Sequence, residues 1–204
     1  MRSVAALLVL VLFAGGATAA MQPPSEPDAA VLLDFSSSIP ENFWRILKAE
    51  LHQVTVEGLR RDSTLWTKSE KFYEDMQAGD IFQVRLTGDC GMGMEPDRST
   101  PGPLGWVYQI DGKILPFVFV DCDRIARTLR SDLRGQTPAI RRQKLARAIS
   151  RVIAHEITHI VTQDPDHRVQ QAHLSPAELA DAWPRATLVT GNGKDAPHER
   201  EAHQ

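Results

Sequence analysis

The sequence predicts a single domain of the α+β class, and two observations support this. Short apolar runs typical of strands alternate with amphipathic segments typical of helices, and one long helical segment follows them. When an N-terminal targeting segment is set aside, about 184 residues remain, which suits one domain with its own hydrophobic core. The strands are too mixed with helices for an all-β fold, so we expect a mixed sheet, a long helix and a C-terminal helix.

The two ends of the chain are expected to lie outside this domain. Residues 1–20 combine a basic residue, a short apolar run and small residues, a pattern typical of a secretory signal peptide. Residues 21–30 are rich in proline and acidic residues and predict a flexible leader, and the polar residues 184–204 predict a disordered tail. The domain is therefore predicted to span residues 31–183 of a secreted or periplasmic protein, with no stable membrane insertion after signal cleavage.

The charge balance argues against two classes of partner. The chain carries 23 basic and 26 acidic residues, a formal net charge of −3. Neither nucleic acid nor an anionic membrane is expected as a partner. The basic residues between positions 141 and 151 alternate with apolar residues at helical spacing, so we interpret them as a solvated helix face.

The chain contains two cysteines, Cys90 and Cys122. An even count in an exported chain favours a disulfide. Two cysteines this far apart do not make a metal site by themselves.

Each segment of the domain has a pattern that predicts its secondary structure. Predicted strands are Val31–Phe35, Val54–Leu59, Ile81–Leu86, Trp106–Ile110 and Ile114–Val120. Predicted helices are Pro40–Leu51, Cys122–Leu133, a long helix from Thr137-Pro138 to Asp164-Pro165, and one from Ser175-Pro176 to about Trp183. Asp111-Gly112 predicts a hairpin turn, and Pro116 indicates an edge position or a bulge. Residues 60–79 receive no assignment, and residues 88–105 are expected to form a long irregular loop.

The long helix carries the motif His155-Glu156-Ile157-Thr158-His159 close to its end. Residues four apart share one helix face, about 5–6 Å apart at Cβ, so His155 and His159 can bind one Zn²⁺ through bonds of about 2.0–2.1 Å. Glu156 lies about 100° around the helix, where its carboxylate can reach a water that the metal holds. This arrangement is typical of metal-assisted hydrolysis with Glu156 as the general base.

A catalytic zinc needs a third protein ligand and one open position. A turn after the motif helix can bring His167 back over the face that carries the two histidines. Glu178 is the alternative, because it lies on the last predicted helix, with eighteen residues between it and His159. Asp164 and Asp166 are weaker candidates, since either can instead orient an imidazole from behind.

The sequence resembles the metzincin-like zinc peptidases, and more closely a group of uncharacterised exported bacterial proteins predicted to be such peptidases. The resemblance covers roughly residues 86–179 and implies a zincin-like fold, Zn²⁺ as cofactor and His167 as third ligand. The residues that carry it are Gly105-Trp106, Pro116-Phe117, Val120-Asp121-Cys122, the run from Arg151 to Glu156, His159 and His167.

The chain departs from the ordinary metzincin pattern after the second histidine. Thr162 and Pro165 stand where that pattern has a glycine and the third histidine. A longer turn to His167 can substitute, since two extra residues relieve the need for a glycine-tight reversal. The methionine that normally packs beneath the zinc and a downstream tyrosine have no counterpart.

The predicted function is that of a secreted, monomeric, zinc-dependent endopeptidase acting on a peptide or protein substrate. An extended substrate is expected along an edge strand, either Trp106–Ile110 or Ile114–Val120, and this expectation fails if both strands are paired on both edges. One alternative is an exported zinc-binding module with weak catalysis, which the intact Glu156 argues against. A zinc amidase acting on cell-wall peptides and a metal-free structural domain are the others.

Overall fold

The computed structural model describes residues 27–56, 58–71, 78–90, 102–165 and 175–181. They form one five-stranded sheet with the strand order β2-β1-β3-β5-β4. The strands are β1 (Ala29–Phe35), β2 (Thr64–Lys68), β3 (Asp80–Thr87), β4 (Gly105–Ile110) and β5 (Lys113–Asp121). Every neighbouring pair is parallel except β4 and β5, which are antiparallel, so the predicted α+β class with a mixed sheet is confirmed.

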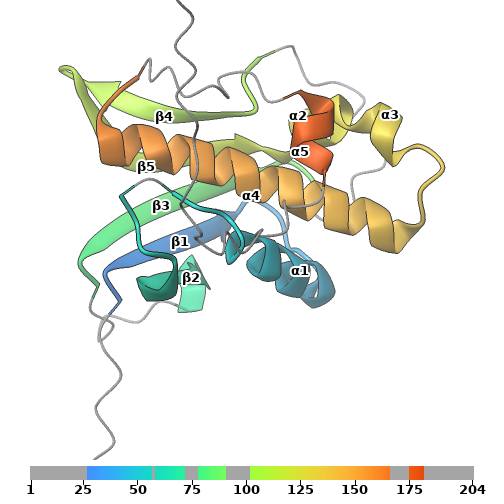
Figure 1. The fold of residues 1–204 in the computed structure, drawn as a ribbon, viewed down its shortest axis with the longest axis horizontal. Helices are drawn as coiled ribbons and strands as arrows, with labels where there is room; N and C mark the ends of the chain where they lie inside the picture. The colour runs from blue at the N-terminus through green and yellow to red at the C-terminus, as the bar shows by residue number, and fades with distance from the viewer. Residues whose placement is uncertain (1–26, 57, 72–77, 91–101, 166–174, 182–204) are drawn as a thin grey trace, which may run out of the picture.

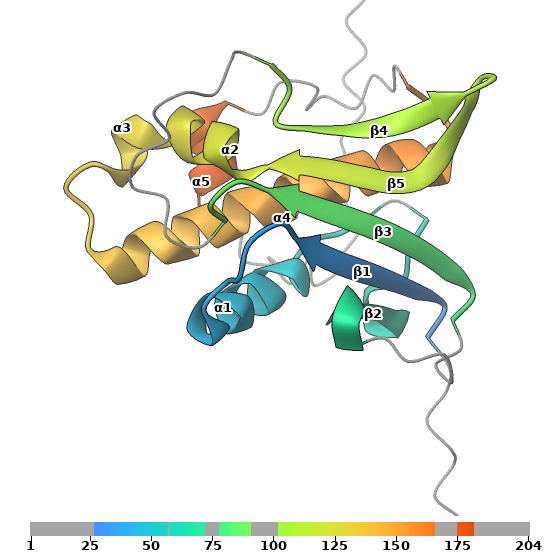
Figure 2. The same ribbon diagram turned by 180° about the vertical axis from the view of Figure 1, so that it is seen from behind.

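Two of the helices lie against one face of this sheet, as Figures 1 and 2 show from opposite sides. The helices are α1 (Glu41–Leu51), α2 (Cys122–Thr128), α3 (Arg130–Leu133), α4 (Pro138–Thr162) and α5 (Pro176–Ala180). The long helix α4 runs along the sheet beside α1, and α2, α3 and α5 gather at one end of the domain. No helix in the described part of the chain is long and apolar enough to cross a membrane.

The core lies between the sheet and the pair α1 and α4. The first five residues of β1 are all buried because this strand is flanked by β2 and β3 and covered on its face, which explains its unbroken apolar run. On α4, the buried side chains of Ile149, Ile153 and Ile157 repeat every four residues along the face that meets the sheet. Each fully buried side chain of this size contributes about 1.5–3 kcal/mol.

Two predicted strand assignments need correction. The stretch Val54–Leu59 is not a strand in its described residues, because the backbone there continues the turn that ends α1, with Val54 N–H donating to the Leu51 carbonyl at 3.3 Å. Val54 and Val56 are buried as irregular chain, which accounts for their apolar character. The strand is instead β2, within the unassigned residues 60–79, and β1 begins at Ala29, inside the expected leader.

The helices are largely as predicted, with differences at their ends. The Thr137 hydroxyl accepts a hydrogen bond from Ile140 N–H at 3.4 Å and Pro138 opens α4, as expected. Segment Cys122–Leu133 is two helices, because Leu129 leaves helical geometry between α2 and α3. Gln163 ends α4 in the left-handed conformation, with φ of 54°.

The basic face of α4 is not uniformly solvated as predicted. Arg147 is only 9% exposed, and its guanidinium binds both carboxylate oxygens of Glu50 on α1 at 3.1 Å. The same guanidinium donates to the Ala180 carbonyl at 3.1 Å. Arg147 therefore joins three helices in the interior.

The predicted hairpin is present, and the pairing of its second strand bears on the predicted edge position or bulge at Pro116. Asp111 and Gly112 both have positive φ, 49° and 77°, as a two-residue hairpin turn requires. Strand β5 lies between β3 and β4, but β3 pairs with it only from Phe117, so Pro116 lies where β5 has no β3 neighbour. Pro116 also falls within the irregularity between the pairs Val107↔Val118 and Gln109↔Ile114, where three residues of β5 face one of β4.

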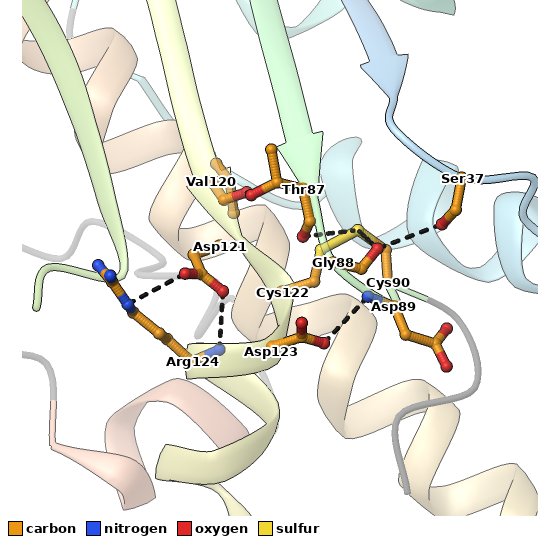
Figure 3. The surroundings of a disulfide bond; sticks show 10 residues. All are labelled: Ser37, Thr87, Gly88, Asp89, Cys90, Val120, Asp121, Cys122, Asp123 and Arg124. Carbon is orange, nitrogen blue, oxygen red and sulfur yellow. Dashed lines mark hydrogen bonds and ion pairs between the residues drawn. A yellow bond between two sulfur atoms is a disulfide. The ribbon is translucent and has the colours of Figure 1, made fainter. Parts of the chain in front are cut away.

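The predicted disulfide between Cys90 and Cys122 is confirmed, with the two Cα atoms 4.9 Å apart. It joins the chain just after β3 to the start of α2 (Figure 3). Beside it, the Asp123 carboxylate accepts from Asp89 N–H at 3.0 Å, and the Ser37 hydroxyl donates to the Gly88 carbonyl at 3.2 Å. These contacts tie together the ends of three neighbouring strands.

Candidate metal centre

Helix α4 directs His155 and His159 toward one point. Their Nε2 atoms are 3.2 Å apart, and their ring planes are nearly perpendicular, at 89°. Two nitrogens bound to one tetrahedral zinc at about 2.0–2.1 Å lie about 3.3 Å from each other. The separation of the two nitrogens therefore matches that of two ligands on a single zinc ion.

A backbone carbonyl fixes the orientation of one of these rings. The Nδ1 atom of His159 lies 2.8 Å from the Asp164 carbonyl oxygen. Because a carbonyl only accepts, Nδ1 carries the proton and Nε2 keeps its lone pair in the neutral ring. A contact of this kind is usual behind metal-binding histidines. It comes from the backbone of Asp164 and not from the carboxylate that the sequence offered as a candidate.

Glu156 lies beside the pair and is almost fully buried, at 7% exposure. Burial penalises the ionised carboxylate and raises the pKa of Glu156 to about 7. A carboxyl group with this pKa exchanges a proton readily near neutral pH, as a general acid or base must.

Gly105, the first residue of β4, allows the edge strand to approach this carboxylate. A Cβ atom at Gly105 would lie 3.0 Å from Cγ and Oε1 of Glu156 and 2.7 Å from Cγ1 of Val152. Any side chain there would force α4 and β4 apart or move the carboxylate. An isolated glycine in a strand often marks a close approach of the backbone to another group, so this role of Gly105 could have been predicted from the sequence.

An open cleft of about 730 Å³ runs between β4 and α4. Its walls are mostly apolar, and the groups of Glu156, His155 and His159 form its polar floor. The residues that line it are Gly102, Pro103, Leu104, Gly105, Trp106, Val107, Gln109, Ile114, Thr128, Val152, His155, Glu156, His159 and Pro165. Trp106 is thus at the cleft rather than in the core, and its ring stacks on Phe119 at 5.4 Å.

One wall of the cleft is fixed by polar contacts. The Asp121 N–H donates to the Leu104 carbonyl at 2.9 Å, and the Arg124 guanidinium donates to the Pro103 carbonyl at 3.0 Å. The Asp121 carboxylate in turn forms an ion pair with Arg124 at 3.0 Å and accepts from its N–H. The backbone leading into β4 is therefore held in place by residues at the β5–α2 junction.

Of the two candidate third ligands, the structure describes only Glu178. His167, and Asp166 beside it, lie outside the described residues. Glu178 is described, and its exposed carboxylate accepts from Ser175 N–H at 2.7 Å, so it caps the start of α5. The pKa of Glu178 is lowered, mainly by this backbone hydrogen bond. Among the described side chains, no group of three metal-binding residues forms.

The roles of two further residues near the site were not identified from the sequence. Gln163 binds the backbone of Ile114 at the start of β5 through its side-chain amide. Arg151, one turn before His155, donates to the Glu178 carbonyl and helps Arg147 hold α5 on α4. Neither role has a sequence signal, since each depends on a segment distant in the chain.

Comparison with protein-family models found no matching family, and comparison with curated proteins and with solved structures found no match. The assignment of a function therefore rests on the geometry of the cleft and its side chains.

Proposed function

We propose that this protein is a zinc-dependent peptidase with a zincin-like, specifically metzincin-like, catalytic domain. The observation that carries the proposal is the convergence of the His155 and His159 Nε2 atoms, 3.2 Å apart, beside the buried carboxylate of Glu156 in an open cleft. The donor set suits zinc, because imidazole nitrogens are among its preferred ligands.

His155 and His159 would hold the metal, and zinc bound there would supply Lewis-acid activation of water at neutral pH. Glu156 accepts the proton of the attacking water and then delivers it to the leaving amine.

The substrate peptide is proposed to lie along β4. Among the described strands β4 pairs only with β5, whereas β5 pairs with β4 on one edge and, from Phe117 to Asp121, with β3 on the other. Of the two strands expected to bind substrate, β4 is therefore the one we propose. Its backbone adjoins the cleft from Gly105 to Val107, and an extended peptide added there would pass over the two histidines.

His167 is proposed as the third ligand, with Glu178 as the alternative. The involvement of the Glu178 carboxylate in capping α5 supports this order, because binding zinc would cost α5 that cap. The disulfide Cys90–Cys122 supports an exported protein, since such bonds persist in oxidising compartments.

The zinc content of the purified mature protein tests the proposal. About one zinc per chain is expected in the wild type, with loss in His155→Ala and His167→Ala and retention in Glu178→Ala. Loss in Glu178→Ala with retention in His167→Ala would move the third ligand to Glu178. A wild type that takes up no zinc after reconstitution would refute the enzyme assignment.

A peptide-library assay then separates an active peptidase from a weak zinc-binding module. Cleavage is expected for the wild type, and none for Glu156→Gln at equal zinc content. Release of products from cell-wall peptides without cleavage of ordinary peptides would indicate a zinc amidase, since that reaction uses the same chemistry.

A further inference from the structure

The side chain of Gln163 connects the end of the motif helix to the β4–β5 hairpin. Its Oε1 accepts from Ile114 N–H at 3.0 Å, and its Nε2 donates to the Ile114 carbonyl at 3.0 Å. Nε2 also donates to the carbonyl of Ile160, at 2.6 Å, within the last turn of α4. The amide thus binds both backbone polar groups of a single strand residue, as a neighbouring strand would.

The position of Ile114 explains why these backbone groups accept a side chain. Strand β3 pairs with β5 only from Phe117 onward, so no main chain of β3 pairs with Ile114. The side chain of Ile114 is 1% exposed, which fixes this part of β5 in the core. Gln163 is therefore attached to a rigid point of the sheet.

This attachment controls the backbone at the turn that follows the metal-binding helix. Gln163 has a left-handed backbone conformation, which glycine adopts more easily than a residue with a side chain. The next residue, Asp164, presents the carbonyl that accepts from His159 Nδ1 at 2.8 Å. The direction of that carbonyl depends on the Gln163 backbone, which the two bonds to Ile114 hold in place.

We propose that Gln163 is a positioning residue of the metal centre. By anchoring the left-handed turn to Ile114, it holds the Asp164 carbonyl against His159 and so selects the ring form with its lone pair on Nε2. The inference rests on the proposed zinc site for its functional meaning, but the anchoring and the ring form can be measured without metal. The same two bonds attach the β4–β5 hairpin to the end of the metal-binding helix.

Two substitutions test the hydrogen bonds from Gln163 to Ile114 separately from the left-handed turn. Gln163→Asn keeps an amide and tolerates the left-handed conformation, but it is one methylene too short to span both Ile114 groups. Gln163→Glu keeps the length but cannot donate to the Ile114 carbonyl. Leu133→Ala shortens a buried side chain on α3, which packs against α4, and is the control for a general loss of stability.

Two measurements are made on each full-length variant. Nitrogen-15 NMR of the imidazole rings in metal-free protein at pH 8 reports which nitrogen of His159 is protonated. Competition with a chromophoric chelator reports the zinc dissociation constant. We expect the Nδ1-protonated form of His159 in the wild type and in Leu133→Ala, and a shift toward Nε2 protonation in both Gln163 variants, with zinc affinity reduced about tenfold.

Every outcome decides the proposal. An unchanged His159 ring form in both Gln163 variants overturns it whatever the affinities, and so does an equal effect of Leu133→Ala. A shifted ring form without loss of zinc affinity overturns the link to the metal. If the wild type binds no zinc, the proposed function fails, while the ring form in the metal-free variants still shows whether Gln163 positions His159.

Discussion

Replacement of the buried carboxyl group by an amide, Glu156→Gln, is expected to stabilise the metal-free protein at alkaline pH. The glutamine has nearly the shape of a protonated glutamate but no charge to lose on burial. In the wild type, burial raises the pKa of Glu156 from 4.5 to about 7. The folded protein therefore pays a free-energy penalty whenever this carboxyl group ionises.

The sign and size of the effect follow from this pKa. Below about pH 4.5 the carboxyl group is protonated in both folded and unfolded states, so it adds no pH-dependent term. Between pH 4.5 and 7 the folded state binds more protons, so the free energy of unfolding falls as the pH rises. The difference of about 2.5 pKa units corresponds to about 3 kcal/mol above pH 7.

Urea denaturation of chelator-treated protein at pH 4.5 and pH 8 measures this difference. Glu156→Gln is expected to unfold at nearly the same urea concentration as the wild type at pH 4.5, and to be about 3 kcal/mol more stable at pH 8. Glu178→Gln is the control, because that carboxylate is exposed and its ionised form accepts the bond from Ser175, so no gain at pH 8 is expected. Equal stability of Glu156→Gln and wild type at pH 8 would refute the reasoning that burial raises the pKa of this group.

Three further predictions concern the architecture around the site. Gly105→Ala is expected to lower turnover about a hundredfold at unchanged zinc content, because its Cβ would displace the Glu156 carboxylate; normal kinetics in steady-state assays would contradict this. The double variant Cys90→Ser/Cys122→Ser is expected to lose about 2–4 kcal/mol in urea unfolding, and a reducing agent is expected to lower wild-type stability similarly. Arg147→Met leaves the Glu50 carboxylate buried without its bidentate partner and is expected to cost about 3–5 kcal/mol in thermal unfolding, whereas Arg147→Met/Glu50→Leu is expected to recover most of it. A double variant as unstable as the single one would show that the loss is one of packing.

The parts of the fold that could be predicted from the sequence are those encoded over a few residues. Thr137-Pro138 marks the start of α4 because capping and proline geometry act within one helical turn. Asp111-Gly112 forms the hairpin turn because only such residues adopt positive φ readily. The strand β2 escaped prediction because its only apolar residues, Leu65 and Trp66, are adjacent and do not alternate with polar residues. The segment Val54–Leu59 was wrongly predicted as a strand because buried irregular chain also contains apolar residues.

The same distinction holds within the candidate site. The sequence alone determines that His155, Glu156 and His159 share one helix, since a spacing of four residues sets their relative positions. Only the tertiary structure decides that Glu156 is buried against Gly105, that Gln163 is bound to Ile114, and that Arg147 is internal. Each of these contacts joins segments far apart in the chain, and no local pattern specifies which distant residue a side chain will meet. A motif therefore specifies the chemistry a helix can perform, and the packing of that helix against β4 and β5 decides the charge state and orientation of its groups.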